Sequence, residues 1–343
     1  MNNPFTSLSY FREQFNQGLC ELLDQQQLGT FILCLANASN NPELFNQLKS
    51  QLKSQFEFLL KQYKLDLING NQINAVEEDL LVFLKLVAMG FENINITQLK
   101  EESPWLYQFN QLRSFRPRRM SSFNHNGEMF TPFVENQFNF NKPFMAKECF
   151  WRGEYQGKQL DLFYNKYPFA DLHGLIVPQR EDCLPQFLFQ EMHEYIWGLS
   201  SGLSATLPGA GFGYNSYGAY ASVNHLHFQM FVDDKGLPVS HSHWQHNGGN
   251  DPYPLQVIKS TDRLKSWQVI NELHVKKQPF NLLYLPDALY IMPRKLQGDI
   301  ETPNWSSGFT WYELSGAMLL FNQQDYINLS SNNVFNLLEK LSV

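Results

Sequence analysis

Two histidines and a glutamine alternate in the segment NHLHFQMFV, residues 224–232. On a β-strand, alternate side chains project from the same face, so His225, His227 and Gln229 are expected to share one face while Leu226 and Phe228 share the other. Buried polar side chains are costly unless they are hydrogen-bonded or serve chemistry. The spacing alone leaves three readings open: a hydrogen-bonded polar patch, a pair of metal ligands and a catalytic pair.

The residues before this segment favour the catalytic reading. NSYGAYASVN, residues 215–224, places small and hydrogen-bonding residues in a turn that leads into the expected strand. Such a turn aims backbone N–H groups and hydroxyls at phosphate oxygens without a bulky side chain in the way. The glycines of GAGFGYNSYG do not form a dinucleotide-binding loop, because the G-x-G-x-x-G spacing fails at Ser216 and no P-loop lysine follows.

The chemistry of such a pair is nucleophilic. A neutral imidazole attacks phosphorus near neutral pH and forms a phosphoramidate, which splits one displacement into two. One ring nitrogen attacks while the other keeps its proton and donates it to an acceptor, which fixes the tautomer. A glutamine two residues later hydrogen-bonds phosphoryl oxygens without acting as an acid or a base.

The pattern N-x-x-G-x-x-x-S-x-x-H-x-H-x-Q resembles the active-site signature of the histidine-triad superfamily, in its nucleotidyltransferase branch. That branch includes galactose-1-phosphate uridylyltransferase, the diadenosine tetraphosphate phosphorylases and the GDP-hexose phosphorylases, and the wording NSYGAYASVNHLHFQ is most similar to the last group. FNFNKPF, LFYNKYPFADLHGLIVPQREDCLPQ, DALYIMPRK and WYELSGAMLL follow in the family's order. The resemblance covers roughly residues 110 to 325 and is weak before them.

The resemblance implies a role for each matching residue. His227 would be the nucleophile, with its second ring nitrogen held by the backbone carbonyl of His225. Gln229 would stabilise the nucleotidyl intermediate, and because a third histidine takes its place in the hydrolytic branch, the glutamine favours transfer to phosphate or a sugar phosphate over transfer to water. Asn215 and Ser222 would contact the phosphates and Asn165 the nucleoside. Further candidate substrate-binding residues are Ser216, Gly218, Arg152 and Lys166, and other cations available to the substrate are Arg180, Arg294 and Lys295.

Other polar clusters have plainer interpretations. His173 begins HGLIVP and is expected to pack half-buried, while His193 and His274 are expected on the surface. The cluster SHSHWQHN has zinc-like spacing, but no cysteine or carboxylate lies at close ligand spacing, so a flexible loop is favoured over a metal site at His241, His243 and His246. RSFRPRRM is expected to be a solvated face, with a clamp for a phosphate or an acidic partner as the alternative; its arginines are Arg113, Arg116, Arg118 and Arg119.

Composition narrows the class of protein. The 343 residues carry a net charge of −7, which argues against a dedicated nucleic-acid binder. The four cysteines contain no CxxC pair, which argues against a disulfide framework or a thiolate metal site and fits a reducing cytoplasm. The N-terminus lacks the pattern of a signal peptide, and LLVFLKLVAMGF is too short to cross a membrane.

The elements that position the histidines are read from periodicity. Three helices are expected at residues 8–28, 42–63 and 76–90, followed from about residue 106 by short aromatic strands. These strands are FNFNKPFMAKECFWRGEY, LDLFYNKYP, HGLIVP, NHLHFQMFV, PFNLLYL and DALYIMPRK. One long helix is expected over LPQFLFQEMHEYIWGLSSGL, residues 184–203, and a last helix over 332–343.

The expected fold is therefore α+β: an antiparallel histidine-triad-like sheet with a long helix on its face, plus a helical N-terminal region. The expected division is a helical region at 1–105, a catalytic domain at 106–330 and a C-terminal helix at 331–343.

The expected function is phosphorolysis of a GDP-hexose to GDP and hexose 1-phosphate through a guanylyl-histidine, with nucleoside diphosphate hexose and inorganic phosphate as partners and no cofactor. The protein is expected in the cytoplasm, away from nucleic acid and membranes, and a homodimer is a possible assembly. The alternatives are a dinucleoside polyphosphate phosphorylase, a hexose-1-phosphate uridylyltransferase, a non-catalytic nucleotide-binding module and a metal-dependent hydrolase built on the His241 cluster.

Overall fold

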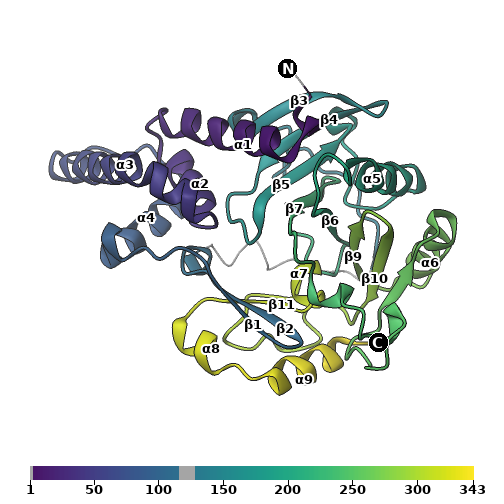
Figure 1. Ribbon diagram of the computed structural model, residues 1–343. Coiled ribbons are helices and arrows are strands. Elements are labelled where there is room, and N and C mark those ends of the chain that lie inside the picture. Colours follow the sequence, from purple (N-terminus) through teal and green to yellow (C-terminus); the bar gives the residue numbers. More distant parts are fainter. Residues whose placement is uncertain (1–2, 116–127) are drawn as a thin grey trace.

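An eight-stranded antiparallel sheet forms the centre of the protein in the computed structural model, which describes residues 3–115 and 128–343 (Figure 1). Its strand order is β3-β4-β5-β7-β6-β9-β10-β8. The bounds, in chain order, are β3 Cys149–Tyr155, β4 Lys158–Tyr164, β5 Asp171–Pro178, β6 Ala210–Asn215, β7 Phe228–Val232, β8 Ile258–Ser260, β9 Phe280–Leu285 and β10 Ala288–Pro293.

The inner strand β9 is buried on both faces of this sheet, because its alternate residues enter different cores. In β9, Leu282 and Tyr284 pack into the larger core with α5 (Gln190–Leu203) and α6 (Arg263–Val275), whereas Leu283 packs into a second core. The second core lies against a three-stranded sheet. The fold class expected from the sequence, an antiparallel sheet with a long helix on its face, is confirmed.

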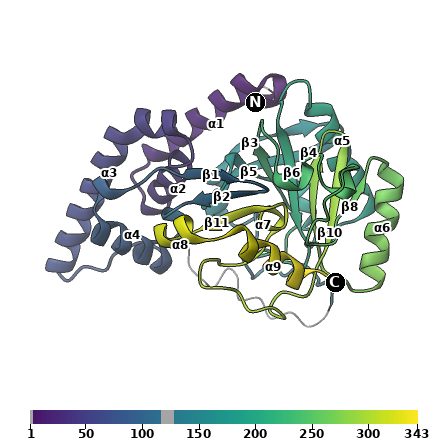
Figure 2. The ribbon, with the colours of Figure 1, turned by 60° about the horizontal axis from the view of Figure 1, so that its bottom comes forward.

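The smaller sheet joins distant parts of the chain. Its order is β1-β2-β11, with β1 at Gln98–Glu102, β2 at Trp105–Phe109 and β11 at Ala317–Leu320. β1 and β2 form an antiparallel hairpin, and β11 pairs with β2 in parallel. The short helix α7 (Trp311–Leu314) precedes β11, and α8 (Gln323–Asn328) and α9 (Ser331–Leu341) follow it, so the last expected helix is present. Figure 1 shows these elements below the main sheet, and Figure 2, in which the bottom comes forward, shows them in front.

Four helices form the N-terminal region: α1 (Leu8–Leu23), α2 (Leu28–Ala38), α3 (Pro42–Ile68) and α4 (Glu77–Met89). The helix expected over residues 8–28 is wrong in its end, because α1 stops at Leu23 and a separate helix, α2, starts at Leu28. Every residue of α2 except Gly29 is buried, so the helix has no polar face and its periodicity is invisible in the sequence. The expected helices at 42–63 and 76–90 correspond to α3 and α4.

The N-terminal helices bind the connection between β4 and β5 through hydrogen bonds and an ion pair. Arg12 of α1 forms a bidentate ion pair with Asp171, with distances of 3.0 and 2.5 Å. Tyr164 donates its hydroxyl to the carbonyl of Phe15 at 2.7 Å. Asn37 of α2 donates to the carbonyl of Asn165 at 2.9 Å. Helices that begin the chain therefore fix a loop that carries a predicted site residue.

Three expected boundaries are wrong. FNFNKPF is not a strand: it forms a turn that leads into a 3₁₀ helix at Pro143–Glu148. The long helix starts at Gln190 rather than at 184, because Pro185 disfavours helical backbone at Leu184. Strand β7 starts at Phe228, so His225 and His227 precede the strand. No helix among the described ranges 3–115 and 128–343 has both the length and the apolar character needed to span a membrane.

Candidate functional site

His227 sits at the start of β7 with its ring fixed by its own chain. Its Nδ1 lies 2.8 Å from the carbonyl oxygen of His225. Because a carbonyl oxygen only accepts, Nδ1 carries the proton and Nε2 keeps its lone pair. Burial lowers the pKa of His227 to about 4, so the imidazole is neutral near neutral pH. A buried neutral imidazole with one free lone pair is a nucleophile, and this is the orientation that the resemblance implies.

His225 is held at both ring nitrogens. The backbone N–H of Phe140 donates to Nδ1 at 3.2 Å, and Nε2 donates to the carbonyl of Arg180 at 3.0 Å. An amide only donates and a carbonyl only accepts, so a single neutral tautomer satisfies both contacts. Burial, followed by repulsion from His227, lowers its pKa to about 4. The Phe140 ring packs on both imidazoles, with ring centroids 5.5 Å from His225 and 5.3 Å from His227.

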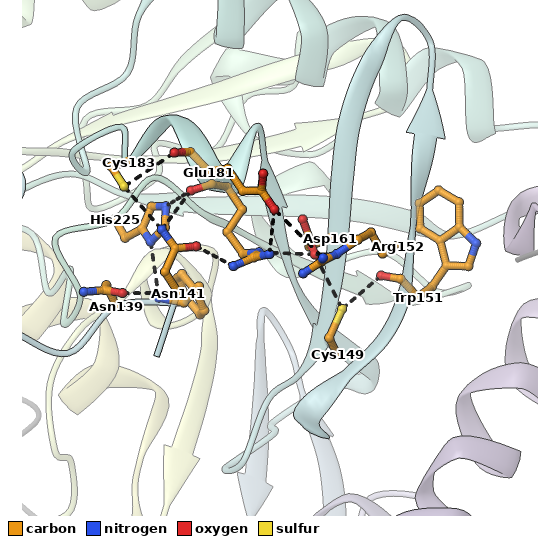
Figure 3. Close-up of polar contacts among 11 residues, drawn as sticks. Asn139, Asn141, Cys149, Trp151, Arg152, Asp161, Glu181, Cys183 and His225 are labelled. Carbon is orange, nitrogen blue, oxygen red and sulfur yellow. Dashed lines mark hydrogen bonds and ion pairs between the residues drawn. The ribbon is translucent and has the colours of Figure 1, made fainter. Parts of the chain in front are cut away.

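Arg180, whose carbonyl accepts from His225, also joins a charged network with Asp161 and Arg152; Figure 3 labels His225, Asp161 and Arg152. Asp161, whose side chain is 5% exposed, accepts from Arg152 Nε at 2.5 Å and lies 3.2 Å from Arg180 Nε. Arg180 also donates to Asn141. Arg152 pairs with Asp161 and leaves 49% of its side chain exposed, so its predicted role in substrate binding stays a prediction.

Gln229 has its amide orientation set by a neighbour. The indole Nε1 of Trp311 donates to Gln229 Oε1 at 3.0 Å. An indole N–H only donates, so the oxygen faces Trp311 and the two Nε2 hydrogens are turned elsewhere. Burial lowers the pKa of the nearby His173 to about 3, so that ring is neutral as well. A neutral donor group, rather than a third acid or base, therefore stands at this position.

His173 lies beside Asn165. It is completely buried, its Nδ1 accepts from the backbone N–H of Phe169 at 3.1 Å, and its Nε2 lies 3.1 Å from Asn165 Nδ2. The expectation of half-burial is wrong, because the Phe169 ring packs against the imidazole with ring centroids 4.2 Å apart. The sheet register brings His173 near the site: Leu175, two residues further along β5, pairs with Gln229 of β7.

The turn after β6 is held together by its own predicted binding residues. Asn215 Oδ1 accepts from Asn281 Nδ2 at 2.7 Å and from the backbone N–H of Trp311 at 3.0 Å. Ser216 Oγ accepts from the Phe280 N–H at 3.0 Å. Gly218 has a φ of 77°, which only glycine adopts readily, and Ser222 is half-buried further along the turn. The structure thus places Asn215, Ser216 and Gly218 in the framework of the turn.

The other basic side chains considered for substrate binding contact protein groups in this structure. Lys166 pairs with Asp79 of α4 at 2.6 Å. Arg294 is buried, with its guanidinium 5.0 Å from the Tyr220 ring centroid, and burial lowers its pKa to about 10. Lys295 donates to the carbonyl of Lys340 at 2.8 Å.

The arginine run of RSFRPRRM is only partly visible. Arg113 is buried and its guanidinium lies 4.6 Å from the Phe169 ring centroid, so a solvated face is the wrong interpretation for this residue. Arg116, Arg118 and Arg119 lie outside the described residues.

The other histidines are structural. His193 is completely buried, contrary to expectation, because α6 covers it: Nε2 lies 3.1 Å from both the Arg263 carbonyl and Ser266 Oγ. His274 is half-buried and stacks on Phe187 with ring centroids 4.2 Å apart, so it is not a free surface residue.

The His241 cluster folds into an ordered turn. His246 Nε2 lies 2.7 Å from the Val239 carbonyl, and Asn247 binds the carbonyls of Val239 and His241. Within residues 3–115 and 128–343, no three His, Cys, Asp or Glu side chains come together as a metal site. The zinc alternative at His241, His243 and His246 is therefore dropped.

Two residues that the sequence did not single out touch the predicted site directly. Trp311 orients Gln229 and also binds Asn215, as described above. Gln186 accepts from the backbone N–H of His227 at 2.9 Å. Both lie far from the histidines in the chain. They could have been found from the sequence only because LPQ and WYELSGAMLL, which contain them, follow the family's order of motifs.

Comparison with known proteins found relatives that match part of the chain. A family model described as "GDPGP1-like, N-terminal domain" matches residues 90–231. GDP-D-glucose phosphorylase 1 of Danio rerio is 30% identical over 138 residues, which are 40% of this chain and 39% of the relative. GDP-L-galactose phosphorylase 2 of Arabidopsis thaliana is 25% identical over 204 residues, 52% of this chain and 47% of the relative. The chain thus spans less than half the length of these curated relatives.

Among solved structures, a yeast Ap4A phosphorylase in complex with Ap4A matches with a TM-score of 0.51 and 13% identity, covering 78% of this chain and 97% of that one. The same phosphorylase with AMP matches with a TM-score of 0.50 and 14% identity, covering 79% and 98%. At this identity the likeness concerns the fold. Together, these matches confirm a resemblance to the GDP-hexose phosphorylases over part of the chain, and the solved structures show a similar fold.

Proposed function

We propose that this protein is a nucleotidyltransferase that phosphorolyses a GDP-hexose to GDP and hexose 1-phosphate. The observation that carries the proposal is the ring of His227: it is neutral, its Nδ1–H is donated to the carbonyl of His225, and its Nε2 keeps a lone pair. The relatives named as GDP-hexose phosphorylases support the choice of substrate.

The first half-reaction uses the lone pair of His227. Nε2 attacks the phosphorus attached to guanosine, a P–N bond forms, and the P–O bond to hexose 1-phosphate breaks with its electrons on the departing phosphate oxygen. The attack leaves positive charge on the imidazole, which the Nδ1–H bond to the His225 carbonyl spreads. A phosphate leaving group is weakly basic, so no acid is required to protonate it.

The second half-reaction reverses the first with a different acceptor. An oxygen of inorganic phosphate attacks the guanylyl group, the P–N bond breaks, and GDP leaves with His227 neutral again. Gln229 presents Nε2 hydrogens because Trp311 holds its Oε1, so it stabilises negative phosphoryl oxygens without activating water. This supports phosphate as the acceptor.

Residues 106–330 are proposed as the catalytic unit. The helices before it brace the loop that carries Asn165, through the Asn37 amide and the Arg12–Asp171 ion pair. Asn165 is proposed to reach the nucleoside, since its backbone is fixed from the helical side and its side chain from His173.

The test is product analysis. The purified protein is incubated with a panel of NDP-hexoses and dinucleoside tetraphosphates, with and without phosphate, and nucleotides are separated by chromatography. GDP that appears only with phosphate supports the proposal and identifies the sugar. GMP formed without phosphate would make water the acceptor, and preference for a tetraphosphate would favour the dinucleoside alternative.

Substitution of the nucleophile completes the test. His227→Asn should lower turnover on the order of a thousandfold, because the P–N intermediate cannot form. His243→Asn, in the loop 241–246, serves as the matched control and should keep full activity. A His227→Asn protein with most of its rate would end this mechanism.

A further inference from the structure

The backbone around His227 is not held by the sheet. β6 and β7 pair as far as Gly213 opposite Gln229, and the same register would place Asn215 opposite His227. The pairing stops there: β7 begins at Phe228, while β6 continues to Asn215 only by pairing with β9. The two strands therefore diverge at the residue that carries the proposed nucleophile, and its N–H and C=O need partners from elsewhere.

The side chain of Gln186 supplies these partners. Its Oε1 accepts from the His227 N–H at 2.9 Å, and its Nε2 donates to the carbonyls of Asn215 at 3.0 Å and His227 at 3.3 Å. A carboxamide is a side-chain copy of a peptide group, with one acceptor and two donor hydrogens. Gln186 thus bridges the diverging strands as a backbone segment would.

Gln186 is itself fixed. It is 2% exposed. Its backbone N–H donates to Asn224 Oδ1 at 3.0 Å, and its backbone carbonyl accepts from the Tyr214 hydroxyl at 3.3 Å. Asn224 in turn donates to the carbonyls of Thr131 and Pro132. The backbone of Gln186 is therefore anchored on both sides, and the side chain that it carries holds its partners at a set separation.

We infer that Gln186 is a positioning residue for His227: its carboxamide sets the spacing between the backbones of His227 and Asn215 and so places the imidazole for attack. The kinetic part of this inference rests on the proposed phosphorolysis. The geometric part does not, because it concerns the orientation of one ring in the free protein.

The test replaces one hydrogen-bonding atom. Gln186→Glu keeps the shape and the acceptor for the His227 N–H, but as a carboxylate it turns an oxygen toward two carbonyl oxygens. Its kcat should fall roughly a hundredfold at pH 8.5, which is the effect of a misplaced reacting group. A buried carboxyl facing carbonyls binds a proton readily, so at pH 6 the O–H replaces the lost donor and the deficit relative to the wild type should shrink.

The groups near position 186 do not confuse this profile. Among the described residues, neighbouring titratable side chains are His227, Tyr214 and His274, the last of these stacked on Phe187. His225, beside His227, is neutral as well, because burial lowers its pKa to about 4. The pKa values of His227 and His274 are lowered by burial to about 4 and that of Tyr214 is raised by burial, so all three stay neutral between pH 6 and 8.5.

Two further variants separate positioning from general damage. Gln186→Leu removes all three bonds and should be slow with no recovery at pH 6. Gln278→Glu is the matched control, because Gln278 also donates to two backbone carbonyls, those of Pro279 and Arg294, away from His227. It should show no pH-dependent recovery of kcat. Equal recovery in Gln278→Glu, or a flat Gln186→Glu profile, would overturn the inference.

A measurement without substrate separates the two proposals. The ¹⁵N shifts of His227 at pH 7.5 report the Nδ1–H tautomer in the wild type and should report a mixture in Gln186→Leu. A wild type without phosphorolysis but with this change would sink the proposed function and keep the positioning role. An active wild type with unchanged shifts in Gln186→Leu would sink the positioning role and keep the function.

Discussion

Four histidines make the stability of this protein strongly dependent on acid. Burial lowers the pKa of His173 to about 3 and those of His225, His227 and His274 to about 4, from an ordinary value of 6.5. The unfolded chain therefore takes up protons below pH 6.5 that the folded chain refuses. The stability that these four neutral imidazoles contribute is fully present above pH 6.5, and it is lost as the pH falls toward 4.

The magnitude follows from the shifts. At pH 5.5, one unit below the unfolded value, each imidazole favours the unfolded state about tenfold, or about 1.4 kcal/mol. The four together cost about 5 to 6 kcal/mol, a large part of the total stability of an ordinary domain. We expect the contribution of these four histidines to the free energy of unfolding, measured by urea titration, to fall by this amount between pH 7.5 and pH 5.5. Glu148 opposes this fall, because burial raises its pKa to about 7 and the folded protein binds its proton over the same range.

His274→Phe isolates one of the four without touching the site. The ring stacks on Phe187 and lies 5.4 Å from the Phe280 centroid, so a phenyl group fits the same aromatic setting. The loss of stability between pH 7.5 and 5.5 should then be smaller by about 1.4 kcal/mol. Phe187→Leu, the control, should lower stability at both pH values by a similar amount. If His274→Phe keeps the wild-type pH dependence, the reasoning from buried neutral histidines is refuted.

Three other substitutions test separate contacts. Trp311→Phe removes the N–H that holds Gln229, so kcat should fall about tenfold and the GMP share of the product should rise when phosphate is limiting; an unchanged GDP to GMP ratio would speak against this orientation. Arg12→Ala should cost about 1 kcal/mol in urea unfolding, since its ion pair with Asp171 is about one-third exposed; equal stability would mean that the pair does not help dock α1. Gly213→Ala places a Cβ 2.1 Å from the Trp311 ring, and a loss of about 1 to 3 kcal/mol is expected from overpacking; a stable variant would show that the ring can move.

The alternation at residues 225–230 was readable from the sequence because burial follows a period of two. Leu226 and Phe228 are completely buried in the main core, and the two imidazoles lie on the other side against Phe140. The period survives although the hydrogen-bonded strand begins only at Phe228. Extended backbone, rather than a sheet ladder, is what the pattern reports.

Other parts of the site could not be read in this way. Gln186 lies among residues whose apolar spacing continues the stripe of α5, so a helix was expected where the chain is extended. His193 was expected on the surface because the sequence cannot show that α6 covers the second side of α5. Trp311 looks like any core aromatic until its indole nitrogen is found beside Gln229. Each of these depends on a contact between distant segments, which local periodicity does not encode.

The parallel pairing of β2 with β11 means that β2 is synthesised long before the strand with which it pairs. About 200 residues separate Phe109 from Ala317, so at 5 to 20 residues per second a ribosome needs roughly 10 to 40 s to deliver β11 after β2. Throughout that interval the edge of β2 that will receive β11 has no strand to pair with, and an open strand edge is a template for association with other chains. The smaller sheet is therefore the part of the protein for which we expect a holding chaperone to matter most during translation.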